Sequence, residues 1–210
     1  MQRALGRPAP DGAAGRVRFG VAPGALEGCD PEVAERVARA LAALERAGCE
    51  LLETSWPTPD EAFAPSTAIM FAEGAAVHRA NLERCPELFG ADVRGRLETG
   101  LAIPAPLYIA ARREATELKA RVARALAGID VMAGPTVPLT APTLREATDP
   151  ALPARIVAHT RLGNVVGLPV LSLPLPGPGL PVGLQLSALD EAELLAAGAY
   201  VEGVLGAGKG

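Results

Sequence analysis

A long uncharged stretch, residues 162–189, most constrains how this chain folds. Its length and apolar character would suit a membrane-spanning helix, but one helix cannot accommodate five prolines. The prolines are Pro169, Pro174, Pro176, Pro178 and Pro181. Two apolar runs of strand length remain, Val170–Leu175 and Val182–Ser187. We interpret both as strands buried on two faces at the centre of an α/β sheet, and we expect a soluble protein without a membrane partner.

The N-terminal part predicts a βαβ unit. Residues 1–15 are rich in Gly, Pro and Ala and are interpreted as a flexible leader or linker. A strand is expected over residues 16–21, where apolar residues alternate with Arg and Gly. Asp30 and Pro31 suit the start of a helix that Gly48 ends, and Cys49–Glu53 suits a second strand. This order predicts a parallel strand pair with a covering helix.

Helical spacing dominates the middle of the chain, and the C-terminal part returns to strands. Residues 61–127 are expected to be mostly helical, and Gly128 ends the last of these helices. The expected middle helices are Ala62–Leu82, Ala91–Leu97 and Leu107–Leu126; a strand at Ile129–Ala133, a helix at 153–166 and a last helix at Glu191–Val204 follow. Residues 16–205 therefore form one α/β domain in this interpretation, and residues 206–210 form a disordered tail.

Charge and cysteine content restrict the function classes. The formal net charge is −4 and the sequence pI is about 5.3, which argues against a nucleic-acid partner, because such proteins usually carry a basic face. Three cysteines without metal-type spacing, Cys29, Cys49 and Cys85, fit a reducing cytoplasm. The first ten residues contain no apolar segment of the secretory type. We therefore expect a cytoplasmic protein.

The residues themselves indicate no catalytic apparatus. No serine occurs in a G-x-S-x-G or S-x-x-K arrangement, and we interpret Ser172 and Ser187 as buried strand serines bonded to backbone. His78 is expected to be a partly buried or surface helix residue, and no metal site is expected around the two histidines. Arg36–Arg39 is interpreted as part of a solvated helix face. We assign no catalytic residue, metal or cofactor.

Three segments carry a family resemblance. Residues 129–142, IDVMAGPTVPLTAP, resemble the D-x-φ-φ-x-P-T-x-P-x-x-A-P element of the amidase signature family, where φ is apolar. Residues 160–174, TRLGNVVGLPVLSLP, resemble its N-x-x-G-φ-P-φ-φ-S-φ-P element, and residues 179–186, GLPVGLQL, match the element that follows. The order and spacing make the match specific. The resemblance covers about residues 16–205 and implies part of the amidase-type mixed β-sheet core, with helices on both faces.

The motif positions are expected to be structural or to form a pocket wall. Prolines 135 and 138 would end a strand and fix an extended turn, and Pro169 would begin the next strand. Gly167 would close the helix that holds Asn164, whose side chain would bond to nearby backbone in a packing or turn role. The remaining motif positions in this group are Thr136, Gly183 and Gln185.

The resemblance also implies a reaction. Amidase signature enzymes hydrolyse amides through a Ser–Ser–Lys triad and a serine acyl-enzyme, and the triad lies in the N-terminal half of the family fold. This sequence contains no G-G-S-S-type run and no candidate Lys before the βαβ unit. The chain therefore resembles the C-terminal half of an amidase, partnered by an upstream N-terminal half and a small carboxamide substrate. A homodimer, an A-type subunit of a tRNA-dependent amidotransferase, and a non-catalytic scaffold that kept the fold stay open.

Overall fold

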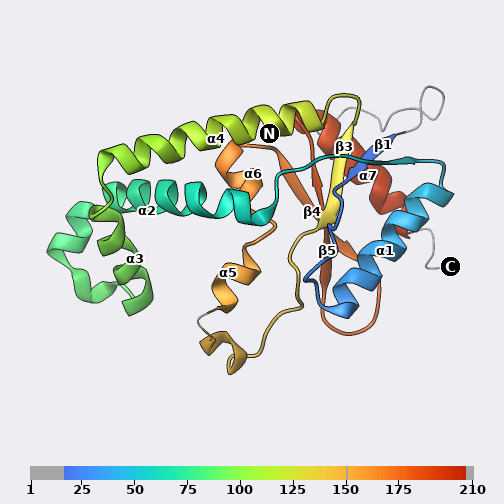
Figure 1. The fold of residues 1–210 in the computed structure, drawn as a ribbon. Helices are drawn as coiled ribbons and strands as arrows, with labels where there is room; N and C mark the ends of the chain where they lie inside the picture. Colours follow the sequence, from blue (N-terminus) through green and yellow to red (C-terminus); the bar gives the residue numbers. More distant parts are fainter. Residues whose placement is uncertain (1–16, 150, 207–210) are drawn as a thin grey trace.

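A computed structural model describes residues 17–149 and 151–206; the expectations for residues 1–15 and 207–210 lie outside this range. Five strands form one mixed sheet in the order β2-β1-β3-β5-β4 (Figure 1). The strands are β1 (Arg18–Val21), β2 (Glu50–Glu53), β3 (Val131–Pro135), β4 (Val170–Leu175) and β5 (Val182–Ser187). Strand β1 pairs in parallel with β2 and β3, whereas β5 is antiparallel to both β3 and β4. The predicted mixed α/β sheet is confirmed.

The βαβ unit forms as predicted. Helix α1 (Pro31–Arg46) connects β1 to β2, and Gly48 follows it with a φ of +94°, a conformation that favours glycine. Asp30 precedes the helix, but its side chain caps no helix N–H group and instead accepts a hydrogen bond from Arg155 at 2.6 Å. Proline at the first helical position therefore starts the helix without a side-chain cap.

Helices cover both faces of the sheet. Helix α1 and the last helix, α7 (Glu191–Gly206), pack on one face around Phe19, Leu184 and Leu186, which are fully buried (Figure 1). The other face is covered in part by α2 (Pro59–Arg84), α4 (Ala105–Ala125) and α6 (Arg161–Val166), which enclose Met132. The second core is smaller than the first, so part of this face stays open near the carboxyl ends of the parallel strands.

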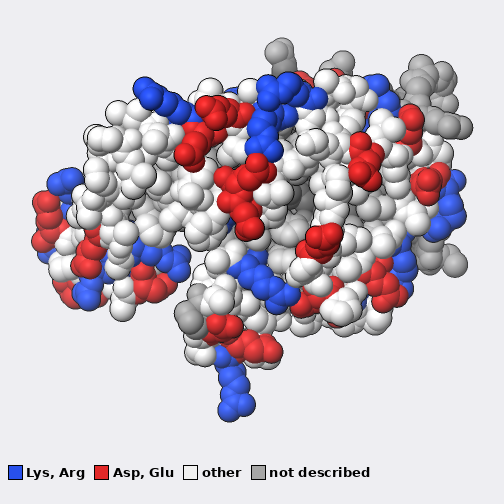
Figure 2. Space-filling view, viewed as in Figure 1, with Lys and Arg blue, Asp and Glu red and all other residues white. Residues whose placement is uncertain are grey.

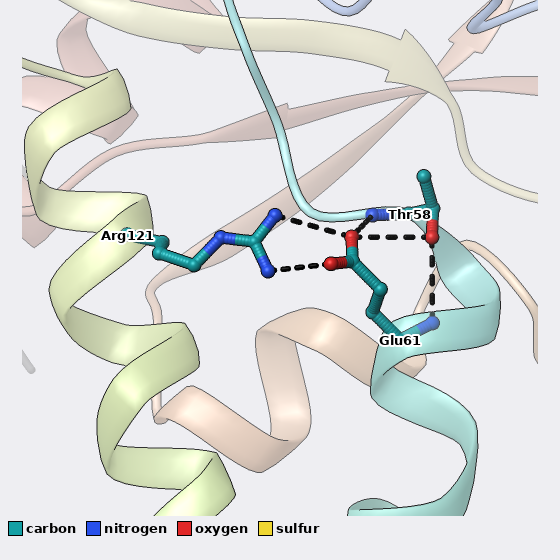
Figure 3. Close-up of polar contacts among 3 residues, drawn as sticks. All are labelled: Thr58, Glu61 and Arg121. Carbon is teal, nitrogen blue, oxygen red and sulfur yellow. Dashed lines mark hydrogen bonds and ion pairs between the residues drawn. The ribbon is translucent and has the colours of Figure 1, made fainter.

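The middle helices extend away from the sheet as an arm. Helices α2 and α4 run side by side, and α3 (Ala91–Leu101) packs against α2 near the far end of the arm (Figure 1). A capping box of Thr58 and Glu61 begins α2, and Glu61 also receives a bidentate contact from Arg121 of α4, at 2.5 and 3.2 Å (Figure 3). These hydrogen bonds lower the pKa of Glu61 to about 2 and connect the two helices.

Several expected boundaries are wrong. The strand expected at residues 129–133 is β3, which begins at Val131 and includes Pro135. The helix expected at 153–166 is two helices, α5 (Leu152–Ile156) and α6. Between them, the Ala158 and Thr160 N–H groups bond three residues back, which tightens the backbone and interrupts the α-helix. Helix α7 includes Gly206, which we expected in the tail. Two 3₁₀ turns, at 86–88 and 146–148, complete the elements.

Burial also differs from expectation at three places. Strand β4 is an edge strand whose side chains alternate between exposed and buried, because only β5 pairs with it. Ser172 on this strand is therefore exposed, whereas Ser187 on the interior strand β5 is buried. Arg36 is not on a solvated face: it is 3% exposed, because it pairs with Glu32 and donates to the backbone of Leu180. No helix among the described residues is long and apolar enough to span a bilayer.

Candidate functional site

A cavity of about 370 Å³ lies at the carboxyl ends of the parallel strands β1, β2 and β3. Residues 22–25 follow β1, residues 56–60 follow β2, and Met132–Pro135 belong to β3; all of them line it. The segment between α5 and α6 and the inner side of β5 form the rest of the wall. Ligands bind at such strand ends in α/β proteins, and the volume lies within the range of about 300–1,000 Å³ for small-molecule sites.

Two polar side chains of the cavity wall are linked. The Gln185 amide donates from Nε2 to the carbonyl oxygen of His159 at 3.3 Å, which joins β5 to the segment before α6. The other amide atom of Gln185, Oε1, is buried and has no partner among the described residues. Burial lowers the pKa of His159, and a hydrogen bond to the backbone of Pro135 opposes this effect. His159 is therefore neutral near pH 7.

A pair of hydroxyl groups lies beside the cavity on the same face of the sheet. Thr136, just after β3, and Ser172, on β4, approach within 2.7 Å through their hydroxyl oxygens. The pair crosses β5 at Gly183, whose carbonyl accepts from the Thr136 N–H at 3.0 Å. A Cβ atom on Gly183 would lie 2.6 Å from the Thr136 hydroxyl and 2.8 Å from that of Ser172. Glycine is therefore required at this position for the hydroxyl pair to form.

The structure brings together some of the predicted motif positions. Pro135 and Gln185 line the cavity, and Thr136 and Gly183 adjoin it through the hydroxyl pair. The carbonyl of Pro138 accepts from the Asp30 N–H at 2.7 Å, which fixes the chain before α1.

The other three predicted positions lie apart from the cavity. Gly167 ends α6 with a φ of +67°, Asn164 is exposed on that helix, and Pro169 precedes β4, where its carbonyl accepts from Ala188. A pocket-wall role for Pro135 and Gln185, and structural roles for the rest, stay predictions.

Sequence reasoning missed the titratable side chains of the cavity. Glu27, Asp60 and His159 line it, yet none belongs to a recognised motif. The sequence contains one signal that could have located Glu27 and Asp60. Each follows a strand that the sequence predicts, and the two strands run parallel to each other. Parallel strands deliver the residues after their carboxyl ends to one edge of the sheet. For His159 we find no comparable signal, since its place depends on the break between α5 and α6.

The cavity wall does not contain a complete nucleophilic site. Among the described residues that line it, Ser187 is the one serine, and no lysine is present. A Ser–Ser–Lys arrangement therefore cannot be built from this part of the chain. Within the described ranges we also find no group of three or more His, Cys, Asp or Glu side chains that could hold a metal ion. The described wall provides a shaped cavity, the Gln185 amide bonded to the His159 carbonyl, the neutral His159 imidazole and the carboxylates of Glu27 and Asp60.

Fold and cavity together define the class of protein: a mixed α/β sheet with a cavity at its parallel strand ends. A sequence model of the family described as "Amidase" matches residues 8–195. The chain belongs to the amidase family and has its hydrolase fold. The match includes all three motif segments noted in the sequence and every strand of the sheet, so the family resemblance is confirmed.

Individual relatives agree with this assignment. An amidase of Pseudomonas putida is 38% identical over 152 residues, which cover 69% of this chain and 33% of that protein. The A-type subunit of the glutamyl-tRNA(Gln) amidotransferase of Halorhodospira halophila is 36% identical over 201 residues, 82% of this chain and 41% of that protein. A crystal structure of an amidase superposes with a TM-score of 0.82 at 32% identity, covering 91% of this chain and 46% of that one. This chain thus spans between a third and a half of these relatives.

Proposed function

We propose that this chain is the C-terminal portion of an amidase-family hydrolase and forms one wall of its substrate site. The complete site cleaves the C–N bond of a small carboxamide to give a carboxylate and ammonia or an amine. The observation that carries this proposal is the cavity: family-motif residues Pro135 and Gln185 line it, while its described lining offers no lysine. A site built this way can bind and orient a substrate but lacks the base of a Ser–Ser–Lys triad.

In this proposal a second polypeptide segment supplies the nucleophile. Its serine attacks the amide carbon, the C–N bond breaks and the amine leaves with a proton, and water then hydrolyses the acyl-enzyme ester. This chain contributes orientation. The Gln185 amide is held by the His159 carbonyl at 3.3 Å, so this part of the wall is fixed before the substrate arrives. The neutral His159 and the cavity carboxylates Glu27 and Asp60 face the substrate.

The test is complementation. The chain is co-expressed with the part of the solved amidase that lies outside its superposed segment, and ammonia release is measured on a panel of small carboxamides. We expect turnover only when both polypeptides are present. Gln185→Ala should lower kcat/KM, because the wall loses its link to His159, whereas Lys119→Ala, on the exposed face of α4, should leave it unchanged. Turnover by the chain alone, or equal activity of Gln185→Ala and wild type, contradicts the proposal.

A second candidate function is the A-type subunit of a tRNA-dependent amidotransferase. The identity of 36% to the Halorhodospira halophila protein favours it. Against it, acidic and basic side chains are intermixed on the face seen in Figure 2, and the formal net charge of the sequence is −4, whereas an RNA-binding surface is usually basic. The complemented protein should therefore release ammonia from carboxamides without glutamyl-tRNA. Release of ammonia from glutamine only when glutamyl-tRNA(Gln) is present would favour the second candidate.

A third candidate is a scaffold that kept the fold and lost the chemistry. The incomplete cavity lining is the observation that favours it. A serine-directed covalent probe separates it from the hydrolase. Labelling of the complemented protein supports the hydrolase, and complete absence of labelling supports the scaffold.

A further inference from the structure

One partly buried arginine near the cavity has no acidic partner. Arg161, the first residue of α6, is partly buried, and no Asp or Glu of the described chain lies within 4.0 Å of its guanidinium. The other described arginines that are buried or partly buried all pair with a carboxylate: Arg18, Arg36, Arg94 and Arg121. Burial lowers the pKa of Arg161, as expected for a cation without a neighbouring anion. Because a desolvated charge is costly unless it is paired, Arg161 is a candidate for binding an anion.

Neutral groups of α2, which packs against α6, hold the Arg161 guanidinium in place (Figure 1). Its Nη1 group donates to the hydroxyl oxygens of Ser66 and Thr67, both at 3.0 Å. Its Cζ atom lies 4.3 Å from the centre of the Phe63 ring, which adds cation–π attraction but no counter-ion. The guanidinium is therefore fixed in position while its charge stays uncompensated, which is the preorganised state that favours binding of an anion.

The edge of the Arg161 guanidinium that contains Nε and Nη2 is free. Nε is buried without a partner among the described residues, whereas Nη2, which also donates to none of them, is open to solvent. Arg18 shows what this edge of a guanidinium binds, because its Nε and Nη2 donate to the two carboxylate oxygens of Asp130 at 3.3 and 2.8 Å. The free edge of Arg161 therefore matches a carboxylate in both geometry and charge.

The guanidinium lies close to the cavity. His159 and Leu162, on either side of Arg161 in the sequence, line the cavity, and Asp60 of α2 lines it as well. Phe63, over which the guanidinium stacks, follows Asp60 by three residues, which corresponds to about 4.5 Å along the helix axis. A ligand in the cavity thus reaches Arg161 with a group carried a few bonds beyond the part that fills the cavity.

We propose that Arg161 binds a carboxylate of the substrate, so that the carboxamide cleaved is one that carries an ionised carboxyl group a few bonds from the amide. The carboxylate contacts Nη2 and reaches Nε after a small shift of the side chains that close Nε to solvent. It supplies the missing counter-ion and an acceptor for the unpartnered donor. This inference rests on the proposed function. A carboxylate of the polypeptide segment that supplies the nucleophile is the competing occupant.

The first experiment measures binding and needs no turnover. The Nε–H resonance of Arg161, identified by its loss in Arg161→Lys, is followed by heteronuclear NMR spectroscopy in the chain complemented with the remaining segment of the solved amidase. Glutaramate, which carries a carboxylate, and glutaramide, its neutral analogue, are titrated in turn. We expect glutaramate to shift the resonance saturably and glutaramide to leave it in place. Equal responses to the two ligands overturn the proposal. A resonance that the complementary segment shifts and that glutaramate then leaves in place also overturns it, in favour of a protein carboxylate.

The second experiment measures discrimination between the two amides. In the complemented protein, Arg161→Gln should lower the ratio of kcat/KM for glutaramate to kcat/KM for glutaramide by about 10- to 100-fold, because a charge-assisted contact is lost. Arg161→Lys keeps the charge without the fork of two N–H groups and should lower the ratio less. The matched control is Arg113→Gln, on the exposed face of α4, which should keep the wild-type ratio.

An unchanged ratio in Arg161→Gln overturns the proposal, and so does an equal loss of kcat/KM on both amides. The two proposals of this article fail separately. A shift of the Arg161 resonance by glutaramate alone, without hydrolysis, would refute the hydrolase and keep the carboxylate site. Hydrolysis with an unchanged ratio would do the reverse.

Discussion

Gly183 gives a sharp test of the packing beside the cavity. Replacing it with alanine would place a Cβ atom 2.6 Å from the Thr136 hydroxyl and 2.8 Å from the Ser172 hydroxyl. Both distances are far inside van der Waals contact, and the Thr136 Cβ at 3.1 Å leaves little room for retreat. The two hydroxyl groups must therefore separate or the strands must shift. Gly134 is the matched control, because it lies on the adjacent strand β3 and a Cβ there meets nothing within 4 Å.

The two glycine substitutions should affect the free energy of unfolding differently. Overpacking costs about 1–3 kcal/mol, and a separated hydroxyl pair loses a further ~0.5–1.5 kcal/mol. Alanine regains about 0.5–1 kcal/mol by restricting the unfolded chain. Gly183→Ala should therefore destabilise the fold by about 0.5–4 kcal/mol, and Gly134→Ala should be neutral or stabilise it slightly.

The assay is urea unfolding followed by circular dichroism. With a slope of about 2 kcal/mol per molar urea, a loss of about 2 kcal/mol lowers the midpoint by ~1 M. Thr136→Ala should partly rescue Gly183→Ala, because it removes the closest oxygen, so the double variant should lose less than the sum of the two single losses. Equal midpoints for Gly183→Ala and Gly134→Ala would refute this account of the hydroxyl pair.

Three further outcomes are expected. Glu61→Gln should cost about 0.2–1 kcal/mol, because glutamine can keep the capping box with Thr58 but loses the ion pair with Arg121. Since the folded-state pKa of Glu61 is about 2 against 4.5, the contribution of the carboxylate is complete above pH 4.5 and fades as pH falls toward 2, so the variant should show a flatter acid limb in pH-dependent melts. Burial lowers the pKa of His159, so protonation opposes folding and the free energy of unfolding should fall as pH drops below 6.5. His159→Gln should weaken this pH dependence of stability. The control His78→Gln, on the exposed surface of α2, should show the same pH dependence as wild type. Arg36→Ala should cost about 1–3 kcal/mol in urea unfolding, because it empties a buried position and leaves the Leu180 carbonyl without its donor. The Arg39 side chain is 60% exposed, so Arg39→Ala should change stability by less than about 0.5 kcal/mol. Equal losses would contradict the assignment of Arg36 to the interior.

Local patterns were sufficient to predict the βαβ unit and both apolar strands of the C-terminal part. Strands β4 and β5 have the predicted bounds because proline stands on both sides of β4 and directly before β5. The position of β4 at the edge of the sheet could not be predicted in the same way. An apolar run indicates burial only when the whole fold covers it, and which strands become neighbours is decided by long-range packing.

The burial of Arg36 shows a second limit of sequence reasoning. Glu35 and Arg39 nearby are charged, and the i,i+4 spacing to Glu32 suggests an ordinary surface pair. The loop between β4 and β5 folds over the guanidinium, with the Leu180 carbonyl 2.9 Å away, and this cover comes from 144 residues further along the chain. No local pattern contains that information.

The candidate site was likewise predicted only in part, because some of its residues are placed by long-range packing. Motif residues Pro135 and Gln185 reach the cavity because Gln185 lies on a predicted strand and Pro135 lies just past the residues predicted as one. His159 reaches it through an irregular turn that helical periodicity conceals. The unpaired Gln185 Oε1 likewise emerges only when β5 meets the segment before α6.

The central claim is that this chain shapes the site and another polypeptide segment carries the nucleophile. The most direct measurement is intact-mass and peptide mass spectrometry of the complemented protein after reaction with a serine-directed fluorophosphonate. The account predicts one adduct on the complementary segment and none on this chain, including the cavity residue Ser187. An adduct on Ser187, or on any other serine of this chain, would contradict the account.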